Sequence, residues 1–148
     1  MKVSESIVDR IYEAALVPGQ WTRVLEDLSA LSSCFGGLIV SARDHTPNRD
    51  IVTDRLQDVH RRATEDGWWE RNSRAHTLLT LPAGEFHSDA DHFTLEEMAA
   101  QPIYRDLLWP HGCGFAVATH IQIPNGDSLV LSFERARADG PVPKSAVA

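Results

Sequence analysis

The C-terminal third of the sequence alternates apolar and polar positions with a period of two. The pattern runs over residues 115–123 and resumes over residues 129–133. A period of two over this length is typical of half-buried antiparallel strands. The sequence therefore predicts a hairpin of two long strands, preceded by a short helix over residues 102–108.

The turn between these two strands sets their register. Pro124 suits the first central position of a type I turn, and Gly126 suits the left-handed residue of the bulge that follows such a turn. A two-residue Asn-Gly turn is the alternative, but it shifts the register by one residue and brings His120 onto the apolar face. We therefore predict the bulged turn. The predicted pairs are Val117 with Phe133, Thr119 with Leu131, and Ile121 with Leu129.

Helical spacing dominates the N-terminal part of the sequence. Residues 6–16 place Ile7 and Ile11 on one side of a predicted helix, and Pro18 interrupts the pattern. A second apolar stripe then recurs at helical spacing, so the two helices should form a hairpin with a short loop. The second stripe consists of Trp21, Val24, Leu25, Leu28 and Leu31.

Strands are predicted after these helices. Residues 35–42 form the first, and the adjacent Gly36 and Gly37 near its start indicate close packing or a bulge. A turn over residues 44–49 and a short strand over residues 51–53 follow.

Short helices fill the middle of the chain. Asp54 suits the cap of a helix that runs to about Glu65. A second helical segment is predicted over residues 68–79, and a third over residues 95–99. The element order indicates an α+β fold, namely an antiparallel sheet with helices on its faces, PAS/GAF-like, preceded by an N-terminal helical hairpin.

Length and composition narrow the possible functions. Residues 1–141 are expected to form a single domain, and residues 142–148 to begin a linker, because the composition becomes rich in Gly and Pro. The net charge of -7 argues against nucleic-acid binding by this segment, since phosphate contacts need clustered Lys and Arg. No apolar run approaches the ~20 residues of a membrane span. Cys34 and Cys113 are too few for a disulfide framework, so we predict free thiols in a reducing cytoplasm.

Three stretches of the sequence together resemble a known family. They are residues 11–16 with Trp21, residues 66–69 with Asn72, and residues 104–114, in which Tyr-Arg-Asp is followed by Pro-x-Gly. The chain resembles the N-terminal sensory region of LuxR-family helix-turn-helix transcriptional regulators over residues 7–141.

The resemblance implies a PAS/GAF-like domain that binds a small molecule, forms a homodimer and has no catalytic activity. It also implies that DNA is contacted only through a C-terminal module outside this sequence, so we expect a sensor segment of a longer protein. The segment over residues 68–73 lacks the Asp-Pro pair of the acyl-homoserine-lactone receptors, which disfavours an acyl-lactone ligand. Ile7, Ile11 and Val3 are the predicted self-association face.

A ligand pocket is expected to have aromatic walls and a few polar groups. The predicted ligand-binding residues are Trp68, Trp69, Asn72, Tyr104, Trp109 and Thr119. The alternative is that the aromatic residues belong to the core or to a dimer interface, that Asn72 caps a helix, and that Thr119 packs across strands. Trp68 and Trp69 are adjacent, so at most one of them is expected to face a cavity.

Other chemistry finds little support in the sequence. Residues 87–92 contain His, Ser and Asp, but their spacing matches no metal site or catalytic motif, so this segment is interpreted as a solvated acidic loop. Cys113 is interpreted as a buried thiol. No cofactor or metal is predicted. Besides the sensor, two hypotheses stay open: a ligand-free structural dimerisation module, and a small enzyme that uses His and Asp residues.

Overall fold

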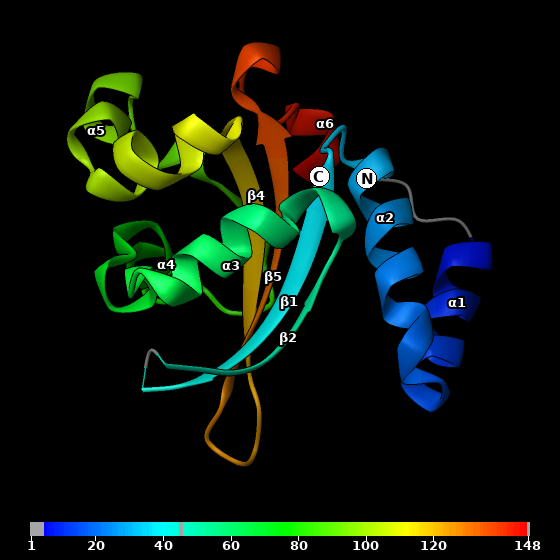
Figure 1. Cartoon of the computed structure of the whole chain (residues 1–148). Helices are drawn as coiled ribbons and strands as arrows, with labels where there is room; N and C mark the ends of the chain where they lie inside the picture. The colour runs from blue at the N-terminus through cyan, green and yellow to red at the C-terminus, as the bar shows by residue number, and fades with distance from the viewer. Residues whose placement is uncertain (1–4, 45, 148) are drawn as a thin grey trace.

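A five-stranded antiparallel sheet separates two groups of helices (Figure 1). The computed structural model of the chain describes residues 5–44 and 46–147, and the strand order is β2-β1-β5-β4-β3. Helices α1 and α2 lie on one side of the sheet, and α3, α4 and α5 lie on the other (Figure 1). The predicted α+β class is confirmed.

The elements have the following bounds. The helices are α1 (Glu5–Leu16), α2 (Trp21–Leu31), α3 (Gln57–Glu65), α4 (Ser73–Leu78), α5 (Leu95–Ala100), a π-helix (Ile103–Leu108) and α6 (Lys144–Val147). The strands are β1 (Gly36–Arg43), β2 (Thr46–Val52), β3 (His87–Ser88), β4 (Cys113–Gln122) and β5 (Ser128–Ala136). Short 3₁₀ turns connect several of them, including Asp54–Leu56, Trp68–Arg71 and Asp89–Asp91. No helix among the described residues is long and apolar enough to cross a membrane.

The β4–β5 hairpin has the predicted register. Val117 pairs with Phe133, and Ile121 pairs with Leu129. Gly126 has a φ of +93°, and its N–H donates to the Ile123 carbonyl at 3.0 Å. The bulged turn therefore places alternate residues of both strands on the same faces, as the sequence predicts.

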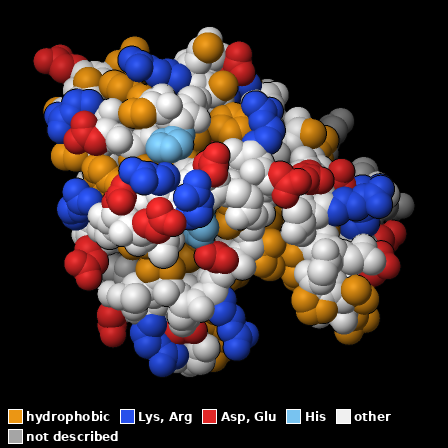
Figure 2. All heavy atoms as spheres, in the orientation of Figure 1, with side chains coloured by type: hydrophobic (Ala, Val, Ile, Leu, Met, Phe, Trp, Pro, Cys, Tyr) orange, Lys and Arg blue, Asp and Glu red, His pale blue; other side chains and the backbone are white. Residues whose placement is uncertain are grey.

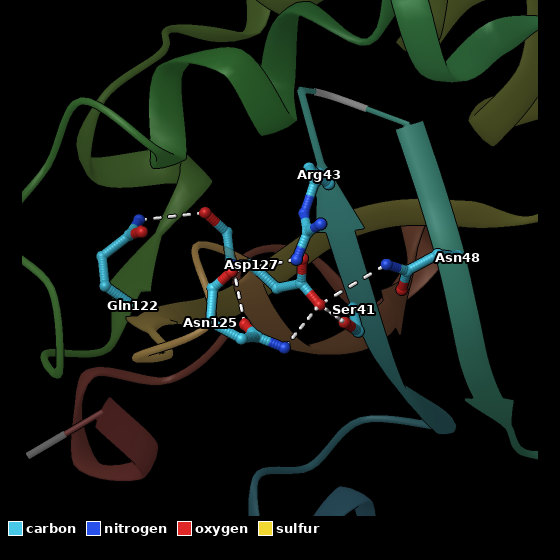
Figure 3. Close-up of polar contacts among 7 residues, drawn as sticks. Ser41, Arg43, Asn48, Gln122, Asn125 and Asp127 are labelled. Atoms are coloured by element: carbon cyan, nitrogen blue, oxygen red, sulfur yellow. Dashed lines mark hydrogen bonds and ion pairs between the residues drawn. The ribbon is translucent and has the colours of Figure 1, made fainter.

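Asp127 joins the tip of this hairpin to the β1–β2 hairpin (Figure 3). Arg43 donates through Nε to Asp127 Oδ1 at 2.7 Å, and Asn125 donates to Asp127 Oδ2 at 3.1 Å. Asn48 of β2 donates to the same Oδ2 at 3.5 Å. Partial desolvation raises the pKa of Asp127, but the hydrogen bonds from Arg43 and Asn48 outweigh it and lower the pKa. This carboxylate therefore holds the two hairpin ends in place.

The N-terminal helices form a separate lobe of the molecule. As predicted, Val24, Leu25 and Leu28 of α2 are buried. In the space-filling view a hollow lies between the lower end of this lobe and the rest of the molecule, the upper part of the lobe joins the rest, and hydrophobic side chains gather at the lower end (Figure 2). Leu16, 86% exposed, and Tyr12, 72% exposed, are the most exposed large hydrophobic residues of α1.

Some boundaries differ from the prediction. Strand β2 begins at Thr46 rather than at residue 51, because it pairs with β1 past a bulge and accommodates a proline at the sheet edge. Asp54 lies inside a 3₁₀ turn, and α3 begins only at Gln57. The helix predicted over residues 68–79 is divided, because Asn72 Oδ1 accepts from the Ala75 N–H at 3.0 Å and starts α4.

The two faces of the sheet carry different side chains. On the face toward α2, Phe133 is fully buried, and a Cβ added to Gly37 would lie 2.7 Å from Phe133 Cδ1 and 3.1 Å from Ser29 Oγ of α2. Gly37 therefore allows β1, Phe133 and α2 to approach closely, which confirms the close packing predicted for the glycine pair.

We predict that Gly37→Ala lowers the free energy of unfolding by about 1–3 kcal/mol, because the added methyl group overpacks a filled part of the core. The midpoint of urea denaturation measures this change. Gly19→Ala is the matched control, since nothing lies within 4 Å of its added Cβ. Equal midpoints for both variants would show that the Gly37 contact is not tight.

Candidate functional site

A cavity of about 140 Å³ lies on the face of the sheet opposite α2. Its floor is formed by β1, β4 and β5, where Ala116, Ala118 and Ser132 lie on the same face. Its walls come from α3, α4, the β3 region and the π-helix. The apolar wall residues include Leu38, Val40, Leu56, Val59, Ala63, Leu78, Ile103, Leu107 and Leu108. Because the floor side chains are small, the helices that cover this face leave the space unfilled.

Arg74 of α4 and Glu134 of β5 form a buried ion pair in the cavity wall. The guanidinium donates through Nη1 to Glu134 Oε2 at 3.1 Å and through Nη2 to Oε1 at 2.5 Å. Glu134 is only 2% exposed. Burial lowers the pKa of Arg74, but attraction by Glu134 outweighs it and raises the pKa above its ordinary value. Arg74 is therefore charged, and each carboxyl oxygen of Glu134 accepts a hydrogen bond from it.

Asp89 lies beside this pair and is only partly satisfied. Its Oδ2 accepts from Tyr104 Oη at 3.0 Å and from the Ala116 N–H at 3.0 Å, and lies 3.9 Å from Arg74 Nη1. Its Oδ1 is buried and has no hydrogen-bond partner among the described residues. We call Arg74, Asp89 and Glu134 the charged cluster.

Burial raises the pKa of Asp89 to about 6 from its usual 3.8. The charge of Arg74, the Ala116 N–H and the Tyr104 hydroxyl favour the ionised form, but only in part, and Glu134 opposes them. Burial also raises the pKa of Tyr104, so its hydroxyl keeps its proton and donates to Asp89.

A second polar region lies toward β2. The ring of His60, on α3, contacts Asp50 through Nε2 at 2.6 Å, and its Nδ1 is buried without a hydrogen-bond partner among the described residues. Trp69 lies edge-on to this ring at 5.2 Å and donates through Nε1 to Thr64 Oγ1 at 3.1 Å. His60 and Trp69 both line the cavity.

Two of the six predicted ligand-binding residues, Trp69 and Asn72, line this cavity. Asn72 also caps α4. Trp68 is buried beneath the Arg71 guanidinium, which lies 4.1 Å from its ring centroid, and is not among the lining residues. Ligand binding by any of these residues stays a prediction.

The other three predicted residues lie next to the cavity or away from it. Tyr104 is fully buried behind Asp89. Trp109 lies under Arg137, 3.9 Å from the ring centroid. Thr119 lies opposite Leu131 on the alternate face of the sheet, because successive strand residues point to opposite faces. The structure therefore does not bring these residues together in one pocket.

The charged cluster is not predicted by any local pattern in the sequence. The prediction of a solvated acidic loop over residues 87–92 is wrong for Asp89, which is buried, although Asp91 and His92 are exposed. The available signal was Glu134, a charged residue inside a long apolar strand. Burial raises the pKa of Cys113 to about 12, consistent with a buried, inert thiol. The described residues contain no group of three or more His, Cys, Asp or Glu side chains that could hold a metal ion.

Comparison with known proteins places this geometry in a known fold. No family model and no curated protein matches the sequence. Among solved structures, the N-acylhomoserine-lactone-dependent LuxR-family factor CepR2 from Burkholderia cenocepacia superposes with a TM-score of 0.72 and 9% identity, over 95% of this chain and 82% of that one. This is the fold of LuxR-type ligand-binding domains.

Two further structures with the LuxR-type fold agree. The VqsR ligand-binding domain from Pseudomonas aeruginosa has a TM-score of 0.69 and 15% identity, over 88% of this chain and 78% of that one. SdiA in complex with octanoyl-rac-glycerol has a TM-score of 0.61 and 12% identity, over 99% of this chain and 61% of that one. The predicted resemblance is confirmed at the level of the fold.

We predict that Asp89 makes the protein less stable as the pH rises from about 4 to about 6. The folded-state pKa of about 6 lies above the unfolded value, so the contribution of Asp89 is fully present below about pH 4 and is lost as the pH rises through about 6. A shift of about two pKa units corresponds to about 3 kcal/mol. Urea unfolding measures the free energy of unfolding of Asp89→Asn and of the wild type at each pH. As the pH rises across this range, the stability of the variant relative to the wild type should increase by up to about 3 kcal/mol.

Asp91→Asn removes the same charge from an exposed position two residues further on, and it shows how much of the effect comes from net charge alone. If the difference between Asp89→Asn and the wild type did not change with pH, the raised pKa of Asp89 would be wrong.

Proposed function

We propose that this chain is the small-molecule-sensing and dimerisation domain of a LuxR-type transcriptional regulator. The observation that carries the proposal is the cavity, which is mostly apolar and has a few charged groups at one end. Such a site suits a small ligand, because apolar walls supply affinity and a few fixed polar groups supply orientation. In this proposal the chain has no catalytic activity and acts by changing its conformational equilibrium when ligand binds.

DNA contact belongs, in this proposal, to a module outside the sequence. The net charge of -7 supports this division, since a DNA-binding surface needs clustered basic residues. The ligand-free dimerisation module is the competing hypothesis. Asp89 Oδ1, which has no partner among the residues that the structure describes, lies in the wall of an unfilled cavity. This favours the sensor, because buried acceptors without a partner are costly in a purely structural core.

Self-association is proposed through α1. Ile7, predicted for that role, is buried in the core at 7% exposure, and Ile11 packs against the same core, so they hold α1 to its own chain. Val3 lies outside the described residues. The outer face of α1 instead carries Val8, Tyr12 and Leu16 at a spacing of four, 40%, 72% and 86% exposed. A second copy of the chain would cover this stripe.

We predict that filling the cavity abolishes small-molecule binding. Ala118→Phe places a ring on the cavity floor. For 1-hexanol and for octanoyl-rac-glycerol, a concentration near one hundred times Kd should raise the Tm of the wild type by roughly 5–10 °C and leave that of the variant unchanged. Differential scanning fluorimetry measures the shift.

Ala99→Phe is the matched control, because the same side chain is added at an exposed position on α5. The control should respond as the wild type does. Stabilisation of Ala118→Phe equal to that of the wild type would place ligand binding elsewhere, and no stabilisation of any form by either probe would favour the ligand-free module.

We also predict that Leu16→Glu weakens the dimer by about tenfold to a hundredfold, because burial of a leucine contributes about 1.5–3 kcal/mol. Sedimentation velocity over a concentration series measures the dissociation constant. Leu95→Glu, at a 65% exposed position on the opposite side of the sheet, is the control and should associate as the wild type does. If the wild type is a monomer, the proposal that α1 mediates association is wrong.

A further inference from the structure

Two hydrogen-bond acceptors and one hydroxyl in the cavity wall have no partner among the described residues. The hydroxyl is Ser88 Oγ, which can donate or accept. Asp89 lines the cavity with its side chain only 5% exposed, and its Oδ1 accepts no hydrogen bond from the described residues. At the other end, His60 Nδ1 is also buried and unpartnered among the described residues; if the ring donates through Nε2 to Asp50, Nδ1 is an acceptor. A ligand that satisfies Asp89 Oδ1 therefore has to donate, and Ser88 Oγ can accept from the same donor or donate to another atom.

The charged cluster is negative as a whole. Arg74 supplies one positive charge, and Glu134 and Asp89 supply two negative charges when both are ionised. Glu134 takes both terminal nitrogens of Arg74, whereas Asp89 lies only within 3.9 Å of one of them. The remaining negative charge is on the carboxylate with the free oxygen. A cation bound at Oδ1 would balance this charge in a site where an unpaired ion is costly.

An anionic head group fits this site poorly. The guanidinium of Arg74 is the only Lys or Arg side chain among the described cavity-lining residues, and both of its terminal nitrogens are already bonded to Glu134. A carboxylate or phosphate reaching it would meet Glu134 and Asp89 at close range. Its repulsion from two carboxylates would exceed its attraction to one guanidinium that is already paired.

The cavity also limits the size of the ligand. Its volume of about 140 Å³ is close to that of an engineered protein cavity of about 150 Å³ that binds benzene. Apart from the charged cluster, aliphatic side chains make up most of the wall, and four histidines also line it, namely His60, His76, His87 and His92. The part of a ligand that lies inside the cavity is therefore a short alkyl chain or a single ring.

We propose that the cavity binds small primary amines, with the ammonium group donating to Asp89 Oδ1 and the hydrocarbon body lying against the apolar wall. This inference rests on the proposed function, because it names the ligand class of the same cavity. Asp89 is the specificity-determining residue: Tyr104 and Ala116 hold its Oδ2, so Oδ1 is fixed in position for the ligand.

Isothermal titration calorimetry with n-hexylamine, 1-hexanol and hexanoate tests the proposal, because the three probes share a chain length and differ in head group. The measurement is made near pH 8, above the Asp89 pKa of about 6. For the wild type we expect n-hexylamine to bind about tenfold to a hundredfold tighter than 1-hexanol, and hexanoate to bind weakest.

Asp89→Asn keeps an acceptor for Tyr104 and Ala116 but removes the charge. It should therefore weaken n-hexylamine binding by about tenfold or more, and the Kd of 1-hexanol should stay within about threefold of the wild-type value. Retained 1-hexanol binding also shows that the variant is folded. Asp91→Asn, which changes an exposed carboxylate of the same segment, should bind all three probes as the wild type does.

The outcomes separate this inference from the proposed function. If 1-hexanol binds as tightly as n-hexylamine, or if Asp89→Asn weakens both equally, the amine inference is overturned while small-molecule binding stands. If hexanoate binds tightest, Arg74 rather than Asp89 determines the specificity, and the amine inference is also overturned. If no probe binds and octanoyl-rac-glycerol does not stabilise the protein either, both proposals fail.

Discussion

Residues of β4 and β5 point alternately to the two faces of the sheet, and this alternation decides which face is filled and which is left hollow. The face toward α2 carries large side chains such as Val117 and Phe133, and Gly37 lets the layers close around them. The opposite face carries Ala116 and Ala118. Small side chains cannot fill the space beneath covering helices, so the cavity follows from the same register that packs the core.

The charges in the cavity wall are difficult to explain by stability alone. A buried ion pair such as Arg74–Glu134 recovers much of its desolvation cost only when every polar atom is satisfied, and apolar side chains often serve stability equally well. Asp89 goes further, because one of its oxygens is left without a partner among the described residues and its ionised form is disfavoured. Groups of this kind are rare in purely structural cores. Their position at the cavity therefore favours binding as the explanation.

Local patterns predicted much of the fold but less of the site. The register of β4 and β5 follows from the turn around Gly126, which involves only a few consecutive residues. The apolar stripe of α2 follows from helical spacing. The site depends on contacts between distant segments: Arg74 meets Glu134 sixty residues further along, and Asp89 meets the Ala116 N–H twenty-seven residues away. No local sequence pattern predicts contacts between residues so far apart in the chain. Most of the aromatic residues predicted to line a pocket do not line it. Residue type alone does not decide the matter, since an aromatic side chain can fill a core as readily as a pocket.

The cavity and the N-terminal lobe lie on opposite faces of one sheet, so the strands are the direct route between them in the proposed sensor. Strand β5 offers a short route, because Glu134 faces the cavity and the preceding residue, Phe133, faces α2. A ligand that alters the pairing of Arg74 with Glu134 would act on the backbone that positions Phe133. Gly37 leaves little free space around that ring, and packed layers of this kind transmit displacement rather than absorb it. If the chain is the sensor proposed above, the close packing at Gly37 would serve both stability and signal transmission to α2 and α1.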